Sequence, residues 1–311
     1  MGRTYKKKKP LLIAVSCVIV LVMLWIGISL GLYGMYFNRK IVNHSSSMLK
    51  VSQFDGLNRT RYEFLSDRGQ TITGYMYEAG KDQKGIIVFS HGYGAGGHNS
   101  YLSGINYFAK NGYYVFAYDV TGNDESAGEV IGGVPQAVID LNYAISFVED
   151  SGNFQKLPIY LFGHSWGGYS VCNVLKYHPE VKAVIECSGP CSSSAFLESG
   201  GRNVVGPLIY VVLPVVKAYE RIRFGDYATN TGIDGLSATD AKVMVVHGAK
   251  DTTIYIEYGY DIYYDHFKDD PRFTFVRLEN EGHNSFIDAD KNPEIYKSFV
   301  EFYNSWLFTS L

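Results

Sequence analysis

An uncharged run of 27 residues, 11–37, constrains this chain more than any other feature of its sequence. About 20 apolar residues are enough to cross the hydrocarbon core of a bilayer as a helix, so residues 11–37 are predicted to form a transmembrane helix. Residues 6–9 are all lysine, and Trp25, Tyr33 and Tyr36 lie near the middle and far end of the run. Basic residues favour the cytoplasmic side and aromatic residues the interface, which predicts a cytoplasmic N-terminus and a body on the outer side.

A cleaved signal peptide is the alternative interpretation of the same segment. Signal peptides have an apolar core of about 7–15 residues, followed by a cleavage site with small residues. Ser29-Leu30-Gly31 fits such a site, but the apolar run continues beyond it. We therefore expect an uncleaved single-pass anchor, with residues 1–10 as a basic cytoplasmic tail. Both interpretations place the rest of the chain on the outer side of the membrane.

The charges divide the chain into two unlike parts. Residues 1–40 hold seven basic residues and no acidic one, whereas the remainder holds 21 basic and 31 acidic residues. An acidic body argues against non-specific nucleic-acid binding, which requires a basic surface. Four cysteines are too few for a disulfide scaffold, and no HExxH or paired CxxC spacing indicates zinc. We therefore expect no nucleic-acid partner, no metal and no cofactor.

Beyond the apolar run, residues 38–60 are polar and rich in serine, and they are interpreted as a tether between membrane and body. From residue 61 onward, short apolar segments alternate with longer amphipathic ones. This alternation predicts a largely parallel sheet with helices on both faces, in one domain over residues 61–311. The expected strands are 61–66, 71–77, 85–90, 113–118, 158–162, 181–187, 242–247 and 272–278, and the expected helices are 99–111, 135–150, 166–178, 254–268 and 293–308.

One insertion, at about residues 189–240, interrupts this alternation. Within it, residues 203–216 carry no charge, yet they are too few to span a bilayer and fit a buried or interfacial segment better. An apolar insertion at the carboxyl edge of a parallel sheet would form a cap over a pocket. The alternative is a helix that packs on the core for stability alone.

The sequence Gly163-His164-Ser165-Trp166-Gly167 fits the pattern G-x-S-x-G. It follows an expected strand and opens an expected helix, which is the context in which this pattern forms a sharp turn that exposes a nucleophilic serine. Ser165 is therefore the candidate nucleophile. The side chain of His164 is expected to point away from Ser165 and to have a structural role.

Serine needs a base to remove its proton, and in this arrangement an acid and then a histidine follow the serine along the chain. Asp251 comes just after the expected strand 242–247, and His283 comes just after the strand 272–278. Because the carboxyl ends of parallel strands meet at one edge of the sheet, these side chains are expected to converge with Ser165.

The tetrahedral intermediate of acyl transfer needs two preorganised N–H donors. The backbone N–H of Trp166 is one candidate, because Trp166 follows the nucleophile. The backbone N–H of Tyr93 is the other, in the glycine-rich loop 91–97 after the strand 85–90. A phosphate-binding loop is the alternative interpretation, but the pattern GxxxxGK[ST] is absent.

Four motifs make the body resemble an α/β-hydrolase, in the branch that contains monoacylglycerol lipases, serine aminopeptidases and related bacterial esterases. They are HGYG (91–94), GHSWGG (163–168), HGAKD (247–251) and EGH (281–283), and the resemblance covers roughly residues 60–308. It implies the α/β-hydrolase fold and a Ser-His-Asp triad. Many relatives carry D-x-R-G-x-G-x-S after the fourth strand, where this chain has Thr121 and Asp124 in place of Arg and Gly.

These features lead to the expectation of a membrane-anchored serine hydrolase that cleaves a small ester or an acyl substrate derived from a lipid. The alternative is a serine aminopeptidase-like peptidase, which needs carboxylates near the pocket to hold an ammonium group. Glu198, Glu220 and Asp226 are the acidic residues that the insertion offers. A non-catalytic binding protein on the same fold is the alternative from another class.

Overall fold

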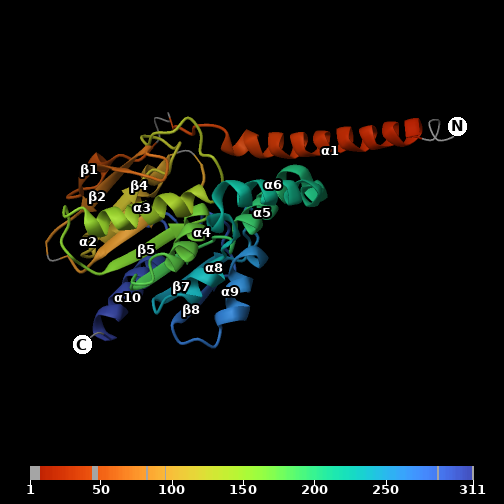
Figure 1. The fold of residues 1–311 in the computed structure, drawn as a ribbon. Helices are drawn as coiled ribbons and strands as arrows, with labels where there is room; N and C mark the ends of the chain where they lie inside the picture. Colours follow the sequence, from red (N-terminus) through yellow and green to blue (C-terminus); the bar gives the residue numbers. More distant parts are fainter. Residues whose placement is uncertain (1–7, 44–47, 82, 95, 286, 310–311) are drawn as a thin grey trace, which may run out of the picture.

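The computed structural model describes residues 8–43, 48–81, 83–94, 96–285 and 287–309. Its most extended element is helix α1 (Lys8–Phe37), which projects from a compact body that holds all the strands (Figure 1). Most side chains of α1 are exposed up to Ile28, including large apolar ones such as Leu21 and Met23. The apolar run therefore forms a helix, as predicted, and by length and hydropathy residues 10–37 are able to cross a membrane.

The body is built on an eight-stranded sheet with the order β1-β2-β4-β3-β5-β6-β7-β8. Strand β2 pairs antiparallel with both β1 and β4. All pairs among β3 to β8 are parallel. The expected largely parallel sheet is therefore confirmed, and each expected strand is present. The strands are β1 (Asn58–Leu65), β2 (Thr71–Glu78), β3 (Ile86–Ser90), β4 (Tyr114–Tyr118), β5 (Ile159–His164), β6 (Ala183–Cys187), β7 (Lys242–Gly248) and β8 (Phe273–Leu278).

Helices cover both faces of this sheet because successive strand residues point to opposite sides and both sides are apolar. In β5, for example, Leu161 belongs to one hydrophobic cluster and Phe162 to the other. The first cluster includes residues of α3 (Gln136–Asp150), α4 (Trp166–Asn173) and α9 (Tyr260–Phe267), and the second includes residues of α2 (Leu102–Lys110) and α10 (Pro293–Thr309). Short 3₁₀ turns are η1 (Val51–Gln53), η2 (Gly97–Tyr101), η3 (Val174–Lys176) and η5 (Ile256–Tyr258).

The insertion between β6 and β7 forms a helical cap at the carboxyl edge of the sheet. It comprises α5 (Ser193–Val205), η4 (Gly206–Leu208), α6 (Ile209–Phe224), α7 (Asp226–Thr229) and α8 (Gly232–Ser237). The stretch from Ser193 to Phe224 is also long and apolar enough to cross a membrane. It is not one straight span, because the chain turns at Gly206, where φ is +57°, and α5 packs against α6. Figure 1 shows α6 beside the end of α1 that adjoins the body.

The start of the polar segment 38–60 is fastened to the body by backbone hydrogen bonds. The N–H of Ile41 donates to the carbonyl of Gly122 at 2.8 Å, and its carbonyl accepts from the N–H of Asp124 at 2.9 Å. The N–H of Asn43 then donates to the carboxylate of Asp124 at 2.7 Å. Residues 41–43 of the segment interpreted as a tether are thus hydrogen-bonded to the body.

Candidate active site

Ser165 stands in a sharp turn between β5 and α4, as the pattern G-x-S-x-G predicted. Its φ is +58° and its ψ is −116°, a conformation that L-residues rarely adopt and that costs on the order of 1–3 kcal/mol. Its N–H donates to the carbonyl of Cys187 on β6 at 2.8 Å, which holds the turn at the sheet edge. Gly163 and Gly167 permit the turn, because a Cβ at either position would overlap a backbone carbonyl oxygen.

His283 and Asp251 come together with Ser165 in a continuous chain of hydrogen bonds. Nε2 of His283 lies 2.9 Å from Oγ of Ser165, and Nδ1 of His283 lies 2.7 Å from Oδ2 of Asp251. The other oxygen of Asp251 accepts from the N–H groups of Thr253 and Ile254, at 2.8 and 2.9 Å. Burial raises the pKa of Asp251, but hydrogen bonds from histidine outweigh it and hold that pKa well below its usual range.

Two buried ionisable residues lie behind Asp251, and sequence reasoning did not single them out. Nε2 of His247 on β7 lies 3.3 Å from Oδ2 of Asp251, and both side chains are fully buried. Glu186, on the neighbouring strand β6, accepts a hydrogen bond from the N–H of Gly189. Burial raises the pKa of Glu186 to about 8, although the nearby His247 and the N–H of Gly189 oppose the rise. Glu186 could have been identified from the sequence, because it is a carboxylate inside an otherwise apolar strand and a buried charge needs partners.

His164 has a structural role, as expected, and it links the two loops of the site. The N–H of Gly92 donates to the hydroxyl oxygen of Tyr101 at 3.0 Å, and that hydroxyl lies 2.9 Å from Nδ1 of His164. Nε2 of His164 lies 3.0 Å from the carbonyl of His283. Burial lowers the pKa of His164 to about 3, and the electrostatic effect of His283 acts in the same direction. The ring of His164 is therefore neutral and donates through Nε2.

Tyr93 and Ser165 line the same cavity, and Trp166 follows Ser165 directly at the start of α4. Trp166 begins α4, so its backbone N–H has no acceptor within the helix. Tyr93 follows β3, and its ring lies 5.7 Å from the ring of Trp166 at an angle of 69°. The indole N–H of Trp166 donates to the carbonyl of Val134 at 2.8 Å, which fixes the ring.

The loop after β4 keeps its packing despite its two departures from the family pattern. Asp124, which stands where relatives have Gly, has a φ of +35°. The N–H of Thr121 donates to the buried carboxylate of Asp140 at 2.7 Å, and Ser126 donates to the carbonyl of Asp119 at 2.5 Å. Asp124 thus has a positive φ at the position where many relatives have glycine, the residue that tolerates such a φ best.

A cavity of about 470 Å³ opens onto Ser165 and His283. It is lined by three parts of the chain: the loops of the site, the cap, and the last turns of α1. Its described lining contains no Asp, Glu, Lys or Arg, and most of it is apolar. Beside the site loops, the lining residues include Leu32, Tyr33, Tyr36 and Phe37 of α1 and Phe196, Leu197, Val204, Val205, Ile209, Val212, Leu213 and Val216 of the cap.

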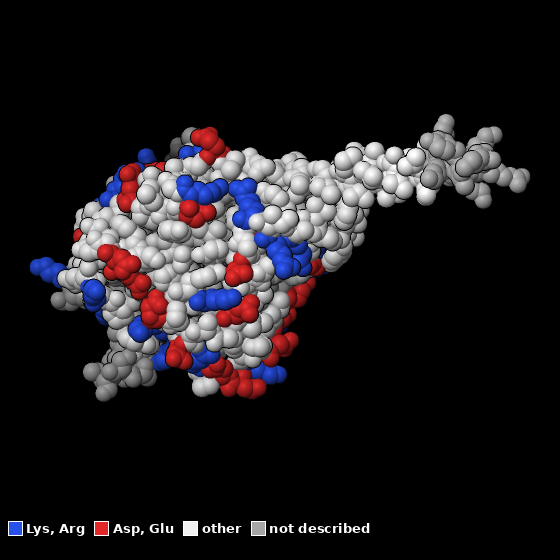
Figure 2. Space-filling view, viewed as in Figure 1, with Lys and Arg blue, Asp and Glu red and all other residues white. Residues whose placement is uncertain are grey.

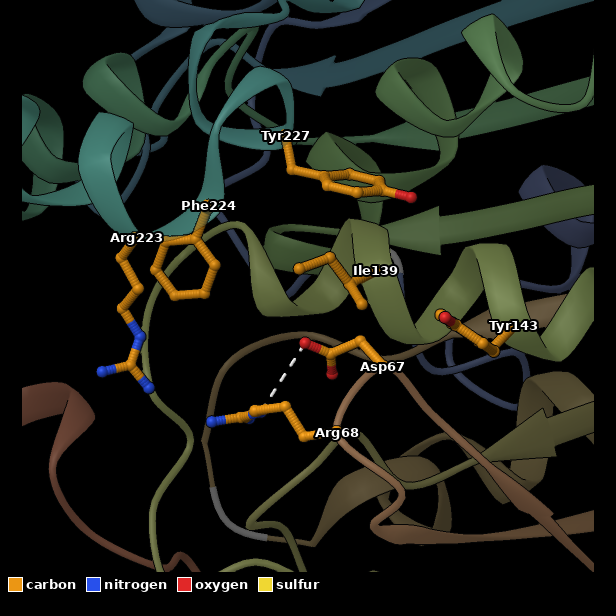
Figure 3. Close-up of a pocket in the computed structure, with 7 residues that line it drawn as sticks. All are labelled: Asp67, Arg68, Ile139, Tyr143, Arg223, Phe224 and Tyr227. Carbon is orange, nitrogen blue, oxygen red and sulfur yellow. Dashed lines mark ion pairs between the residues drawn. The ribbon is translucent and has the colours of Figure 1, made fainter.

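A second cavity, of about 380 Å³, lies away from Ser165 (Figure 3). It lies between α3, the end of α6 and the turn after β1, and Arg68 forms an ion pair there with Asp67 at 3.6 Å. None of its lining residues belongs to the hydrogen-bonded chain at Ser165.

One group of described residues has the composition of a metal site. Ligand atoms of Glu149, His178 and Glu180 lie within 4.8 Å of one another. Both ring nitrogens of His178 already have hydrogen-bond partners, since Nδ1 lies 2.9 Å from Glu180 and Nε2 lies 2.9 Å from Asn142. The group is therefore explained as a hydrogen-bonded cluster around the buried ring of His178.

Comparison with known proteins connects this arrangement with one family. Residues 81–221 match the family model of serine aminopeptidase S33, a stretch that runs from before β3 into α6 and includes Ser165. No curated protein matches the sequence.

Solved structures share the fold at low sequence identity. An esterase of Pyrococcus furiosus is 16% identical, with a TM-score of 0.66, over 86% of this chain and 98% of its own. Carboxyl esterase 2 of the fungus Tuber melanosporum is 18% identical, with a TM-score of 0.61, over 84% and 88%. An acylaminoacyl peptidase of Pyrococcus horikoshii is 16% identical, with a TM-score of 0.61, over 81% of this chain but only 42% of its own. At such identities, the likeness establishes the fold alone.

Proposed function

We propose that this chain, which has the α/β-hydrolase fold, is a serine hydrolase that cleaves carboxylic esters while α1 anchors it in a membrane. The observation that carries the proposal is the hydrogen-bonded chain Ser165–His283–Asp251, at 2.9 and 2.7 Å, at the mouth of an apolar cavity. Such a chain serves to activate a serine for attack on an acyl carbon.

In the proposed reaction, Oγ of Ser165 attacks the carbonyl carbon of the ester and its proton passes to Nε2 of His283. The backbone N–H groups of Tyr93 and Trp166 stabilise the negative oxygen of the tetrahedral intermediate. His283 then protonates the departing alcohol, which leaves an acyl group on Ser165. Water attacks this acyl group, gives its proton to His283, and releases the carboxylic acid and the free serine.

Asp251 has an orienting and electrostatic role in this proposal. Its carboxylate stays ionised, because the histidine hydrogen bonds hold its pKa below the usual range against the effect of burial. It accepts the Nδ1–H of His283, so the other ring nitrogen is left free to take the proton of Ser165. The negative charge also stabilises the imidazolium that forms during attack.

The membrane part of the proposal places the basic N-terminus in the cytoplasm and the body outside. The distribution of lysines before α1 supports this orientation. Integration of the end of α1 into the body supports an uncleaved anchor over a signal peptide. Ser29, the first residue of the segment that fits a cleavage site, is buried there at 0% exposure, and Tyr33 and Phe37 beyond it are buried at 6% and 3%.

A peptidase is the second candidate, and the match to the serine aminopeptidase model favours it. The cavity lining argues for an ester instead, because a peptide's ammonium group needs an anion nearby. Glu198 accepts from the hydroxyl of Tyr258 at 2.8 Å, and Glu220 is buried among its own donors. Neither these residues nor Asp226 lines the described part of the cavity.

The deciding experiment compares the full-length protein with Ser165→Ala in detergent or nanodiscs. We expect a fluorophosphonate probe to label the wild type alone, and p-nitrophenyl butyrate turnover to fall by at least 10³-fold in the variant. Aminoacyl-naphthylamide turnover that exceeds ester turnover would favour the peptidase. A folded wild type that takes no probe would favour a non-catalytic binding protein.

A further inference from the structure

The membrane-side helix α1 ends inside the candidate active site. Its buried stripe Ser29, Tyr33 and Phe37 recurs every fourth residue and so faces the body along one side of the helix. The hydroxyl of Tyr33 donates to the buried carboxylate of Glu220 on α6 at 2.6 Å. These contacts make the last turns of α1 part of the hydrolase domain.

The same end of α1 holds the loop that carries Tyr93. The hydroxyl of Tyr93 donates to the carbonyl of Tyr36 at 2.7 Å, and the ring of Tyr93 lies 5.7 Å from that of Phe37. Tyr93 is also a proposed oxyanion donor through its backbone. Part of the wall of the cavity at Ser165 is therefore formed by α1, and another part by α5 and α6.

The outer face of the cap continues the apolar surface of α1. Val204, Leu208, Tyr210 and Val211 are more than half exposed, and residues 203–216 carry no charge. The indole N–H of Trp25 donates to the carbonyl of Val211 at 2.8 Å, which joins α1 to α6 at this level. Figure 2 shows an uncharged surface along α1 and the adjoining part of the body.

The length of α1 places this junction relative to a bilayer. At 1.5 Å per residue, a hydrocarbon core of about 30 Å that begins at Leu11 ends near Leu30. Trp25 then lies roughly 7 Å inside the outer boundary, and Val211 with it, because the two are hydrogen-bonded. The lining residues Leu32, Tyr33, Tyr36 and Phe37 then emerge just above that boundary.

We propose that the cavity between α1 and the cap binds the acyl chain of an ester that resides in the bilayer, and that the chain enters beside α1. This inference rests on the proposed ester hydrolase function. It adds that the substrate comes from the bilayer and that α1 helps to select its acyl chain. The apolar lining suits an acyl chain, because removing each methylene group of the chain from water stabilises binding. In this arrangement α1 is a specificity element as well as an anchor.

The first test fills the cavity from the α1 side in the full-length protein. Leu32→Trp adds bulk to the lining, and Ile28→Trp adds the same bulk one turn away, at a residue that is 62% exposed and outside the lining. We expect Leu32→Trp to lower the ratio of kcat/KM for p-nitrophenyl palmitate to that for the butyrate by at least tenfold. Ile28→Trp should leave this ratio within twofold of the wild type, and an unchanged ratio in Leu32→Trp overturns the inference.

The second test asks where the substrate comes from. Leu208→Glu places a charge on the exposed cap face, and Ile222→Glu places one on α6 at a residue that is 87% exposed. Each protein is reconstituted in phosphatidylcholine vesicles that contain a long-chain fluorogenic ester. Leu208→Glu should slow hydrolysis of this ester about tenfold with unchanged turnover of soluble butyrate, whereas Ile222→Glu should match the wild type. Equal vesicle rates for wild type and Leu208→Glu mean that the substrate does not enter from the bilayer.

Failure of the inference is distinguishable from failure of the proposed function. If the wild type takes the fluorophosphonate and cleaves butyrate, but neither Leu32→Trp nor Leu208→Glu behaves as expected, only the bilayer route is overturned. If the folded wild type cleaves neither ester and takes no probe, the ester hydrolase itself is overturned.

Discussion

Nε2 of His247 lies 3.3 Å from Oδ2 of Asp251, the oxygen that also accepts from His283. Nε2 of His247 lies 2.9 Å from the carbonyl of Ile254 as well, so it bridges the strand β7 and the turn that follows it. Asp251 is thus held by two backbone N–H groups and approached by two histidines. The position of the carboxylate depends on the whole turn 247–254, and the site is preorganised before any substrate binds.

Asp251→Asn should show whether Asp251 serves to orient His283 or only to stabilise the fold. The amide keeps its shape and leaves the N–H groups of Thr253 and Ile254 with an acceptor, but it loses the negative charge that orients and stabilises His283. We expect kcat for p-nitrophenyl butyrate to fall by roughly 10³–10⁴-fold, with a thermal midpoint close to that of the wild type.

The matched control for this change is Asp265→Asn, an exposed residue of α9. It should leave kcat within twofold. An Asp251→Asn protein with more than a tenth of the wild-type kcat would mean that the carboxylate is structural only.

Glu186→Gln should change how stability depends on pH. Burial raises the pKa of Glu186 from its ordinary value near 4.5 to about 8. Between these values the unfolded chain releases a proton that the folded chain keeps, so the free energy of unfolding falls as pH rises through this window. Glutamine does not titrate, so the fall between pH 5 and pH 8.5 should be smaller in the variant by about 4 kcal/mol.

Thermal unfolding of the full-length protein at the two pH values measures this difference. Glu257→Gln, a half-exposed residue at the edge of the cap, is the control and should follow the wild-type pH dependence. Parallel curves for wild type and Glu186→Gln would show that Glu186 is ionised in the folded protein.

Gly163→Ala should prevent the nucleophile turn from forming. A Cβ at this position would meet the carbonyl oxygen of Gly167 across the turn, and neither group can move without displacing β5 or α4. We expect a loss of more than about 4 kcal/mol in the free energy of unfolding, or no folded protein.

Gly200→Ala is the comparison, because a Cβ in this part of α5 meets nothing within 4 Å. Helix propensity predicts a gain of up to about 1 kcal/mol there. Unfolding monitored by circular dichroism distinguishes the two, and a Gly163→Ala protein as stable as the wild type would contradict the described turn.

Tyr33→Phe should loosen α1 from the body. The change removes one donor to the buried carboxylate of Glu220, which keeps the hydroxyl of Ser193 and the N–H of Val134. A hydrogen bond to a charged group contributes about 1.5–3 kcal/mol, so the thermal midpoint in nanodiscs should fall by several degrees.

Tyr210→Phe removes a hydroxyl from an exposed tyrosine of the same cap and should leave the midpoint within one degree. If Tyr33→Phe also leaves the midpoint unchanged, the bond to Glu220 does not contribute to holding α1.

The sheet and the residues at its edge could be predicted because their signals are local. Each buried strand is a short apolar run, and Ser165, Asp251 and His283 each come directly after one. Parallel pairing then brings strand ends together without further information, so the convergence of the three side chains followed from their spacing alone.

The role of α1 could not be predicted in the same way. A membrane span and a helix packed on a protein are both apolar, so the run 11–37 carried no sign that Tyr33 and Phe37 face the body. The partner Glu220 lies 187 residues away in the sequence. Its position depends on how the cap folds over the sheet, and no local pattern encodes that arrangement.

The shared wall between anchor and cavity has a practical consequence for how this protein is produced. Deletion of residues 1–37 would remove four lining residues, strip Glu220 of a donor and open the hydrocarbon-like interior of the cap to water. A shortened version would differ from the native chain in the cavity at Ser165 as well as in the loss of α1. Detergent molecules could fill the vacated space, so inhibitor screens and crystallisation call for the intact chain in a lipid environment.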